Sequence, residues 1–96
     1  MNMQITKNGT GAVVALEGRL DTVTSEDLNA ALGNELAGAE NLVFDLSRLE
    51  YISSAGLRAL LAAHRLVEGR MKLTHVNEIV LEVLEVTGFN RVLTVE

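Results

Sequence analysis

The sequence predicts a single α/β domain over residues 1–96, with a mostly parallel sheet, an antiparallel N-terminal hairpin strand, and helices after the second, third and fourth strands. The main observation is the order of patterns, β-β-α-β-α-β-α-β, because strands that alternate with helices favour a parallel sheet with right-handed crossovers. The second is length, since 96 residues suffice for one modest core. The third is the absence of repeats, linkers and low-complexity segments.

Residues 3–7 and 12–16 are the expected hairpin strands, joined by the turn cluster at 8–11. The second of these strands is almost entirely apolar, which is typical of a strand buried on both faces. We therefore expect it to be covered on both sides, with the first strand as its antiparallel edge partner.

A first helix is expected to begin at Thr24, which is a suitable N-cap. Asp27 lies three residues further on, where a carboxylate can reach back to the cap, and Val23 is placed to contact Leu28. Gly38 is the expected end of this helix.

The apolar run 42–46 predicts a buried strand, and an amphipathic helix is expected from Ser53-Ser54 to Gly69. This helix carries a line of small residues beside its leucine stripe: Gly56, Ala59 and Ala63. Close packing on the sheet is the favoured explanation for this line, and an approachable surface for another protein is the alternative.

The remaining elements are a strand over 71–76, a third helix and a last strand over 91–95. Asn77 is a natural N-cap for the third helix, and Gly88 is its expected end. Its apolar side is expected to consist of Ile79, Val80, Val83 and Leu84.

Composition excludes several classes of protein. Although 48% of the residues are hydrophobic, no apolar run approaches the ~20 residues of a membrane helix, and the N-terminus has no signal-peptide pattern. The chain has no cysteine, which removes disulfides, thiolate chemistry and most zinc sites. A net charge of −5 with scattered basic residues argues against nucleic acid. We expect a cytoplasmic protein whose partner is another protein with some positive surface.

Two adjacent hydroxyls stand at the start of the second helix. A serine there can cap the free N–H groups of the first turn. It can also be phosphorylated, because a phosphate at this place meets unpaired N–H donors and the positive end of the helix dipole. Since functional loops lie at the carboxyl ends of parallel strands, Asp21 and the pair Ser53-Ser54 are expected at the same edge of the sheet.

Asp21 and Asp45 are candidates for paired acid–base chemistry if they converge at that edge. No histidine is expected to join these two aspartates. His64 is expected to be a packed helix residue, and His75 a strand residue with an ordinary hydrogen bond. The nucleophile elbow, the phosphate-binding loop and the dinucleotide fingerprint are all absent. The sequence therefore indicates a protein that is not an enzyme, with no metal and no cofactor.

Three segments resemble the STAS domain family, and in particular the bacterial anti-sigma factor antagonists. The main signature is Asp45-Leu-Ser47, Leu49, Tyr51-Ile52, the run from Ser53 to Arg58, and Leu60-Leu61. Residues 18–24 resemble the family segment after the second strand, and residues 84–91 resemble the segment leading to the last strand. The likeness covers essentially the whole chain.

This resemblance implies an antagonist that binds an anti-sigma factor while unphosphorylated and so releases a sigma factor. The anti-sigma factor is a serine kinase, and its phosphorylation of the antagonist ends binding. Ser54 aligns with the phosphoacceptor, and Ser53, which stands where well-known members carry an acid, is the runner-up. The partner-binding residues it implies are Asp21, Thr22, Ser53, Ser54, Ala55, Gly56 and Arg58. Such a protein is expected to be a monomer or weak homodimer that contacts neither nucleic acid nor membrane.

Two alternatives remain open. One keeps the fold without the switch, as an unphosphorylated STAS scaffold or sensing module in a larger signalling or transport assembly. The other is a receiver-like phosphoacceptor domain with Asp45 at a strand end, which would need an acidic cluster and a partner lysine that the sequence does not show.

Overall fold

The computed structural model describes all 96 residues and contains one five-stranded sheet with the strand order β1-β2-β3-β4-β5. β1 (Asn2–Asn8) is antiparallel to β2 (Gly11–Leu20). β3 (Asn41–Ile52), β4 (Met71–Thr74) and β5 (Thr94–Val95) form the parallel part of the sheet with β2. The predicted fold class and the order of the elements are confirmed.

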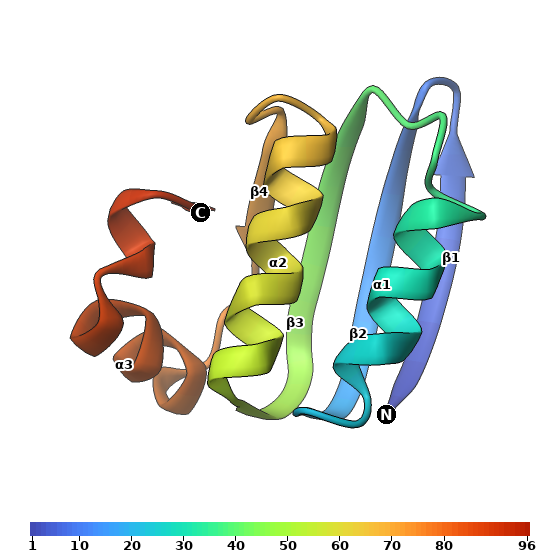
Figure 1. Ribbon diagram of the computed structural model, residues 1–96. Coiled ribbons are helices and arrows are strands. Elements are labelled where there is room, and N and C mark those ends of the chain that lie inside the picture. Colours follow the sequence, from blue (N-terminus) through green and yellow to red (C-terminus); the bar gives the residue numbers. More distant parts are fainter.

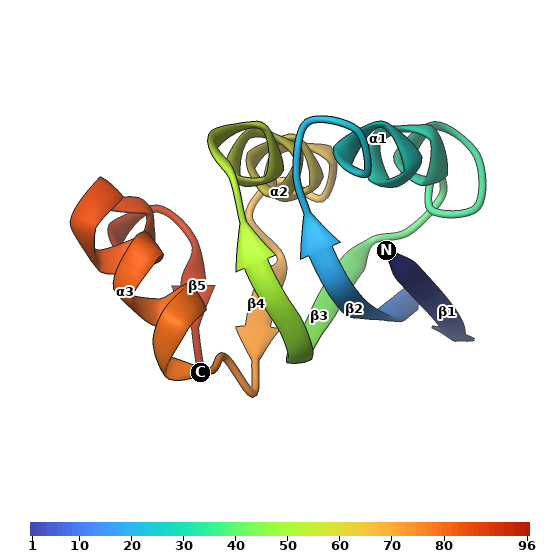
Figure 2. The same ribbon diagram turned by 90° about the horizontal axis from the view of Figure 1, so that it is seen from below.

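Two helices cover one face of the sheet. α1 (Ser25–Gly33) and α2 (Ser54–Leu66) lie side by side on that face, and α3 (Glu78–Thr87) lies beside the β4–β5 edge (Figures 1 and 2). A short 3-10 turn (Phe89–Arg91) leads from α3 toward β5. The core lies between helices and sheet, and its largest fully buried side chains are Phe44, Leu16, Leu20, Leu28, Leu36, Leu42, Leu46, Leu49, Leu60, Leu73, Leu84 and Leu93.

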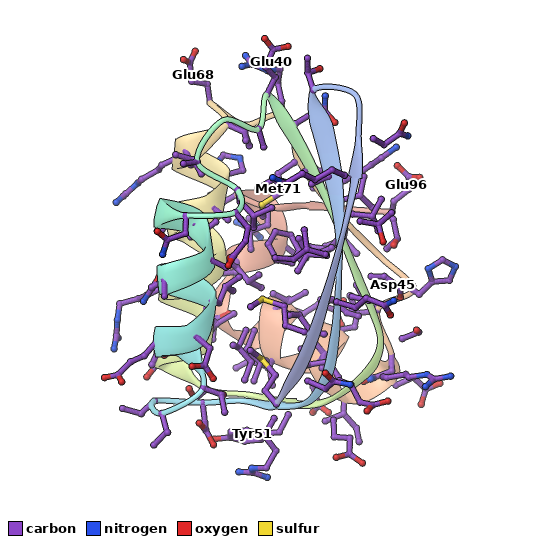
Figure 3. All side chains as sticks on the ribbon, turned by 90° about the vertical axis from the view of Figure 1, so that its right-hand side faces the viewer. Glu40, Asp45, Tyr51, Glu68, Met71 and Glu96 are labelled. Atoms are coloured by element: carbon purple, nitrogen blue, oxygen red, sulfur yellow. The ribbon has the colours of Figure 1, made fainter.

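The other face of the sheet is open where β1, β2 and β3 pair. On β2, Val14 and Leu16 are buried beneath the helices, whereas Val13 is 37% exposed. Figure 3 shows Asp45 projecting from the side that the helices do not cover. The expectation of a strand covered on both faces was wrong, because right-handed crossovers that advance in one direction place α1 and α2 on the same side.

β3 extends well beyond the predicted run 42–46. Its buried residues are two apart up to Leu46 and then three apart, at Leu49 and Ile52. The change comes from two bulges, since the pairing with β2 shifts once between Ala15 and Glu17 and again between Gly18 and Arg19. Each bulge adds one residue to β3, which delays the end of the strand until just before α2.

The helix starts differ in how well the sequence predicted them. Asn77 caps α3 by accepting a hydrogen bond from the Val80 N–H at 3.0 Å, and Gly88 ends that helix with φ of +79°, both as expected. At α1, Thr24 occupies the N-cap position as predicted, but its dihedral angles are helical and its side chain makes no capping bond, and Asp27 makes no return hydrogen bond. Val23, which was expected to pack against Leu28, is 74% exposed.

Other boundaries also moved. α1 ends at Gly33 and not at Gly38, and the last strand, β5, has only two residues. On α3, Ile79 was expected on the apolar side but is 63% exposed, while Val80 and Leu84 are buried.

Candidate functional site

The start of α2 is held against the end of β2. Leu20 pairs with Ile52 in the sheet, and the Ser53 N–H donates to the Leu20 carbonyl at 2.9 Å. Gly56 lies directly behind this bond, where an added Cβ would stand 2.7 Å from the Leu20 carbonyl oxygen. The close approach of backbone to backbone therefore requires glycine, and it brings Asp21 and the serine pair to the same edge, as the sequence predicted.

Ser53 is the N-cap of α2. Its backbone is extended, with φ of −97° and ψ of 175°, and its hydroxyl oxygen accepts a hydrogen bond from the Gly56 N–H at 3.2 Å. Its carbonyl accepts the first bond of the helix, from the Leu57 N–H at 2.9 Å. The Ser53 side chain is half-buried and already serves the helix.

Ser54 is the first residue of α2, and its side chain is exposed. Its hydroxyl forms no hydrogen bond within the protein, and the N–H groups of Ser54 and Ala55, which belong to the first turn, have no acceptor within the helix. Of the two adjacent serines, one therefore has a structural task and the other has a free oxygen. The free oxygen stands where unpaired N–H groups and the helix dipole favour an added negative charge.

The loop after β2 is fastened by its own side chains. The Asp21 carboxylate accepts hydrogen bonds from the N–H groups of Val23 (3.1 Å) and Thr24 (3.0 Å). The Thr24 hydroxyl in turn donates to the Arg19 carbonyl at 2.6 Å and accepts from the Asp21 N–H at 2.8 Å. Hydrogen bonding from the Thr24 backbone is the largest effect holding the pKa of Asp21 below its ordinary value, so Asp21 is a fixed anion at this edge.

Arg19 and Tyr51 complete the edge, although neither was among the residues implied for partner binding. The Arg19 guanidinium lies 4.1 Å from the centre of the Tyr51 ring and 3.8 Å from the Asp21 carboxylate. The two residues are neighbours because the second bulge of β3 pairs them. A pattern search within single segments could not have found this contact, since it joins residues 32 positions apart.

Arg58 lies one turn further along α2 and is exposed. It forms no ion pair and no hydrogen bond in the protein. Gly56, Ala59 and Ala63 are buried, so the line of small residues packs on the sheet, which was the favoured explanation. Six of the seven residues implied for partner binding are thus half-buried or exposed around one edge, and Gly56 lies beneath them.

The two aspartates do not converge. Asp45 sits in the middle of β3, paired with Ala15 and Thr74, seven residues before Ile52, which is roughly 20 Å along a strand. The hydrogen bond from the Ser47 backbone, at 3.0 Å, is the largest effect lowering the pKa of Asp45. Paired acid–base chemistry and a strand-end phosphoacceptor at Asp45 were both wrong, because the strand does not end there.

The histidines also lie outside the edge. His64 is a half-buried residue of α2, as expected. His75 is not inside a strand: it follows β4 with φ of +56°, and its exposed ring lies 3.6 Å from Asp45. No group of three or more metal-ligating side chains comes together in the structure.

The surface hollows lie away from the serine pair. The largest, about 970 Å³, opens on the uncovered face of the sheet between Glu17, Arg48 and Asn77. None of the four hollows is lined by Ser53, Ser54 or Asp21. No helix combines the length and the apolar character needed to cross a bilayer.

Comparison with known proteins assigns the family. Residues 3–95 match the family model described as "Mlab, STAS domain". Over 81 residues the chain is 41% identical to BtrV of Bordetella bronchiseptica, designated an anti-sigma factor antagonist, and the match covers 80% of this chain and 70% of BtrV.

Solved structures of two proteins have the same fold. An anti-sigma factor antagonist from Mycobacterium paratuberculosis is 25% identical, with a TM-score of 0.85 over 98% of this chain and 83% of that one. The Bacillus protein SpoIIAA in its unphosphorylated form is 21% identical, with a TM-score of 0.83 over 99% and 88% of the two chains. Its phosphorylated form matches with a TM-score of 0.67 at 18% identity over 99% and 91%. The chain therefore belongs to the STAS domain family, and within that family its sequence and fold relate it to the anti-sigma factor antagonists.

Proposed function

We propose that this chain is an anti-sigma factor antagonist that is switched by phosphorylation of Ser54. In the unphosphorylated form it binds an anti-sigma factor that is also a serine kinase, and this binding releases a sigma factor for transcription. The relationship to BtrV supports the general role. The observation that carries the switch is the free, exposed hydroxyl of Ser54 beside a Ser53 hydroxyl that is engaged as the helix cap.

The chemistry of the switch is phosphoryl transfer within the complex. The γ-phosphoryl group of ATP passes to the Ser54 oxygen, while ADP leaves and the hydroxyl proton is taken up by the kinase. The phosphoserine then carries about −1.5 to −2 charges and three strong acceptor oxygens. An interface of ~800 Å² per partner tolerates little uncompensated charge at its centre, so phosphorylation weakens binding.

The fold accommodates the phosphate. Ser54 points away from the core, and the unpaired N–H groups of Ser54 and Ala55 lie beside it. Because no buried contact is lost, the modification acts on the partner interface and not on the folding of the domain.

The proposed contact surface is the edge formed by the loop after β2 and the first turn of α2. Its members are Asp21, Thr22, Ser53, Ser54, Ala55 and Arg58, with Gly56 supporting them from beneath. The chain acts by binding and not by catalysis, without metal or cofactor, as a cytoplasmic monomer or weak homodimer. It makes no direct contact with nucleic acid or membrane.

The test is phosphorylation in solution. Wild type, Ser53→Ala and Ser54→Ala are incubated with Mg-ATP and the candidate anti-sigma factor kinase, and intact mass is measured before peptide mapping. We expect one phosphate on wild type and on Ser53→Ala, and none on Ser54→Ala. A phosphate mapped to Ser53 would move the acceptor by one residue. Tight binding with no phosphate on any variant would favour the scaffold or sensing role instead.

A further inference from the structure

α2 is a cationic helix on an anionic protein. The chain has a net charge of −5, yet residues 54–66 contain no Asp or Glu and carry Arg58, His64 and Arg65. Ser54, Arg58 and Arg65 are all exposed, at spacings of four and seven residues, so they share one side of the helix. This side is where a new negative charge on Ser54 would meet a cation of the same helix.

Ser54 and Arg58 are four residues apart, which places their Cβ atoms about 5–6 Å from each other on the helix surface. The Arg58 guanidinium has no partner in the free protein, whereas Arg19, the other arginine of the edge, is held by Tyr51 and Asp21. Arg58 is therefore the arginine that can swing onto a group at position 54 without breaking an existing contact. A guanidinium fork also matches the oxygens of a phosphate better than an ammonium does.

We propose that phosphorylation of Ser54 draws the Arg58 guanidinium onto the phosphate, so that the switch removes a cation from the partner surface as well as adding an anion to it. This inference rests on the proposed function, since Ser54 must be the modified residue. It gives the Arg58 guanidinium, which is exposed and unpaired in the free protein, a partner on its own helix in the phosphorylated state.

The experiment uses the full chain with phosphoserine installed at position 54 by genetic code expansion, so that it needs no kinase. The phosphate is titrated by ³¹P NMR in the wild-type background and in Arg58→Gln. We expect the second pKa of the phosphate to be about 0.3 units higher in Arg58→Gln, because an i,i+4 cation favours the dianion. The acidic groups of the loop after β2 and of the first turn of α1, which are Asp21, Glu26 and Asp27, are present in both proteins, so their effect on the phosphate pKa cancels.

Three companion measurements make the result specific. Arg58→Lys should retain part of the effect, and Arg65→Gln, the exposed arginine in the last turn of α2, should leave the phosphate pKa unchanged. The Arg58 side-chain Nε–Hε resonance should shift when position 54 carries phosphoserine in place of serine. Equal phosphate pKa values in wild type and Arg58→Gln, or an equal shift in Arg65→Gln, would overturn the inference.

The two proposals fail separately. If the kinase does not modify Ser54 but the titration shows the Arg58 effect, the proposed function falls and the helix geometry stands. If Ser54 is modified and binding is lost but the phosphate pKa does not respond to Arg58, the switch acts through the added anion alone.

Discussion

The first turns of α1 and α2 stand at the same edge of the sheet, but their polar groups are used in opposite ways. At α1, the Asp21 carboxylate and the Thr24 hydroxyl are both engaged with nearby backbone groups. At α2, Ser53 caps the helix alone, and the next residue keeps a free hydroxyl. At the start of α1, the polar side chains are hydrogen-bonded to nearby backbone groups. At the start of α2, the hydroxyl of Ser54 has no hydrogen-bond partner in the protein.

This difference is the reason for placing the proposed switch at α2. A group that is already hydrogen-bonded cannot be modified without loss of local structure, whereas the Ser54 oxygen has no such bond to lose. The loop before α1, held by the hydrogen bonds of Asp21 and Thr24, lies at the same edge of the sheet as the serine pair.

The largest effect, on partner affinity, is expected from a negative charge at position 54. Ser54→Asp should lower affinity for the cognate anti-sigma factor on the order of a hundredfold, because an uncompensated charge enters the interface. Its thermal midpoint should stay level or rise slightly, since a carboxylate is favourable at a helix N-terminus. The control is Ser54→Asn, which has similar size and no charge; binding and calorimetry measure both. Equal affinities of the Asp and Asn variants would count against an electrostatic switch.

The second effect is on the free energy of unfolding, and it compares how closely α2 and α1 pack against their neighbours. Gly56→Ala should lower the free energy of unfolding by about 1–3 kcal/mol, because its Cβ would stand 2.7 Å from the Leu20 carbonyl oxygen. Gly33→Ala in α1 is the matched control: no atom lies within 4 Å of the added Cβ, so the helix should gain about 0.5 kcal/mol. Urea denaturation measures both variants. Changes of the same sign would contradict the difference in packing.

The third effect separates the two serines. Ser53→Ala should lower the free energy of unfolding by about 1 kcal/mol through loss of the cap. Ser54→Ala should change it by less than about 0.5 kcal/mol, because it removes no internal contact. If Ser54→Ala proved the more destabilising substitution, Ser54 and not Ser53 would be the residue that caps the helix.

The smallest expected effect is the contribution of Asp21, in the loop before α1, to stability, and it depends on pH. Because the pKa of Asp21 is lowered by folding, its ionised form stabilises the protein above the unfolded-state pKa, and this contribution is lost as pH falls through the lower, folded-state pKa. The thermal midpoint of wild type should therefore exceed that of Asp21→Asn at pH 7, and the gap should narrow below about pH 4. Asp45, whose pKa is also lowered, is unchanged between the two proteins. A gap that is constant with pH would show that ionisation of Asp21 does not matter.

Much of this molecule was predictable from neighbouring residues. The cap at Asn77, the glycine end at Gly88 and the start of α2 at Ser53-Ser54 were predicted because caps and helix stops depend on residues one to four positions apart. The order of the elements followed from hydrophobic periodicity, which is also local. The boundaries of α1 and β5 were less well predicted, since few contacts within those segments decide where they end.

What the sequence alone determined is therefore the succession of strands and helices and the pair of hydroxyls at the head of α2. Tertiary structure decided which hydroxyl is free, how Asp21 replaces Thr24 as the anchor of α1, and where Asp45 lies. The physical reason is the pairing of β2 with β3: its two bulges lengthen β3, carry Asp45 away from the strand end and set Arg19 against Tyr51. Such pairing joins residues about thirty positions apart, and no pattern within a single segment records it.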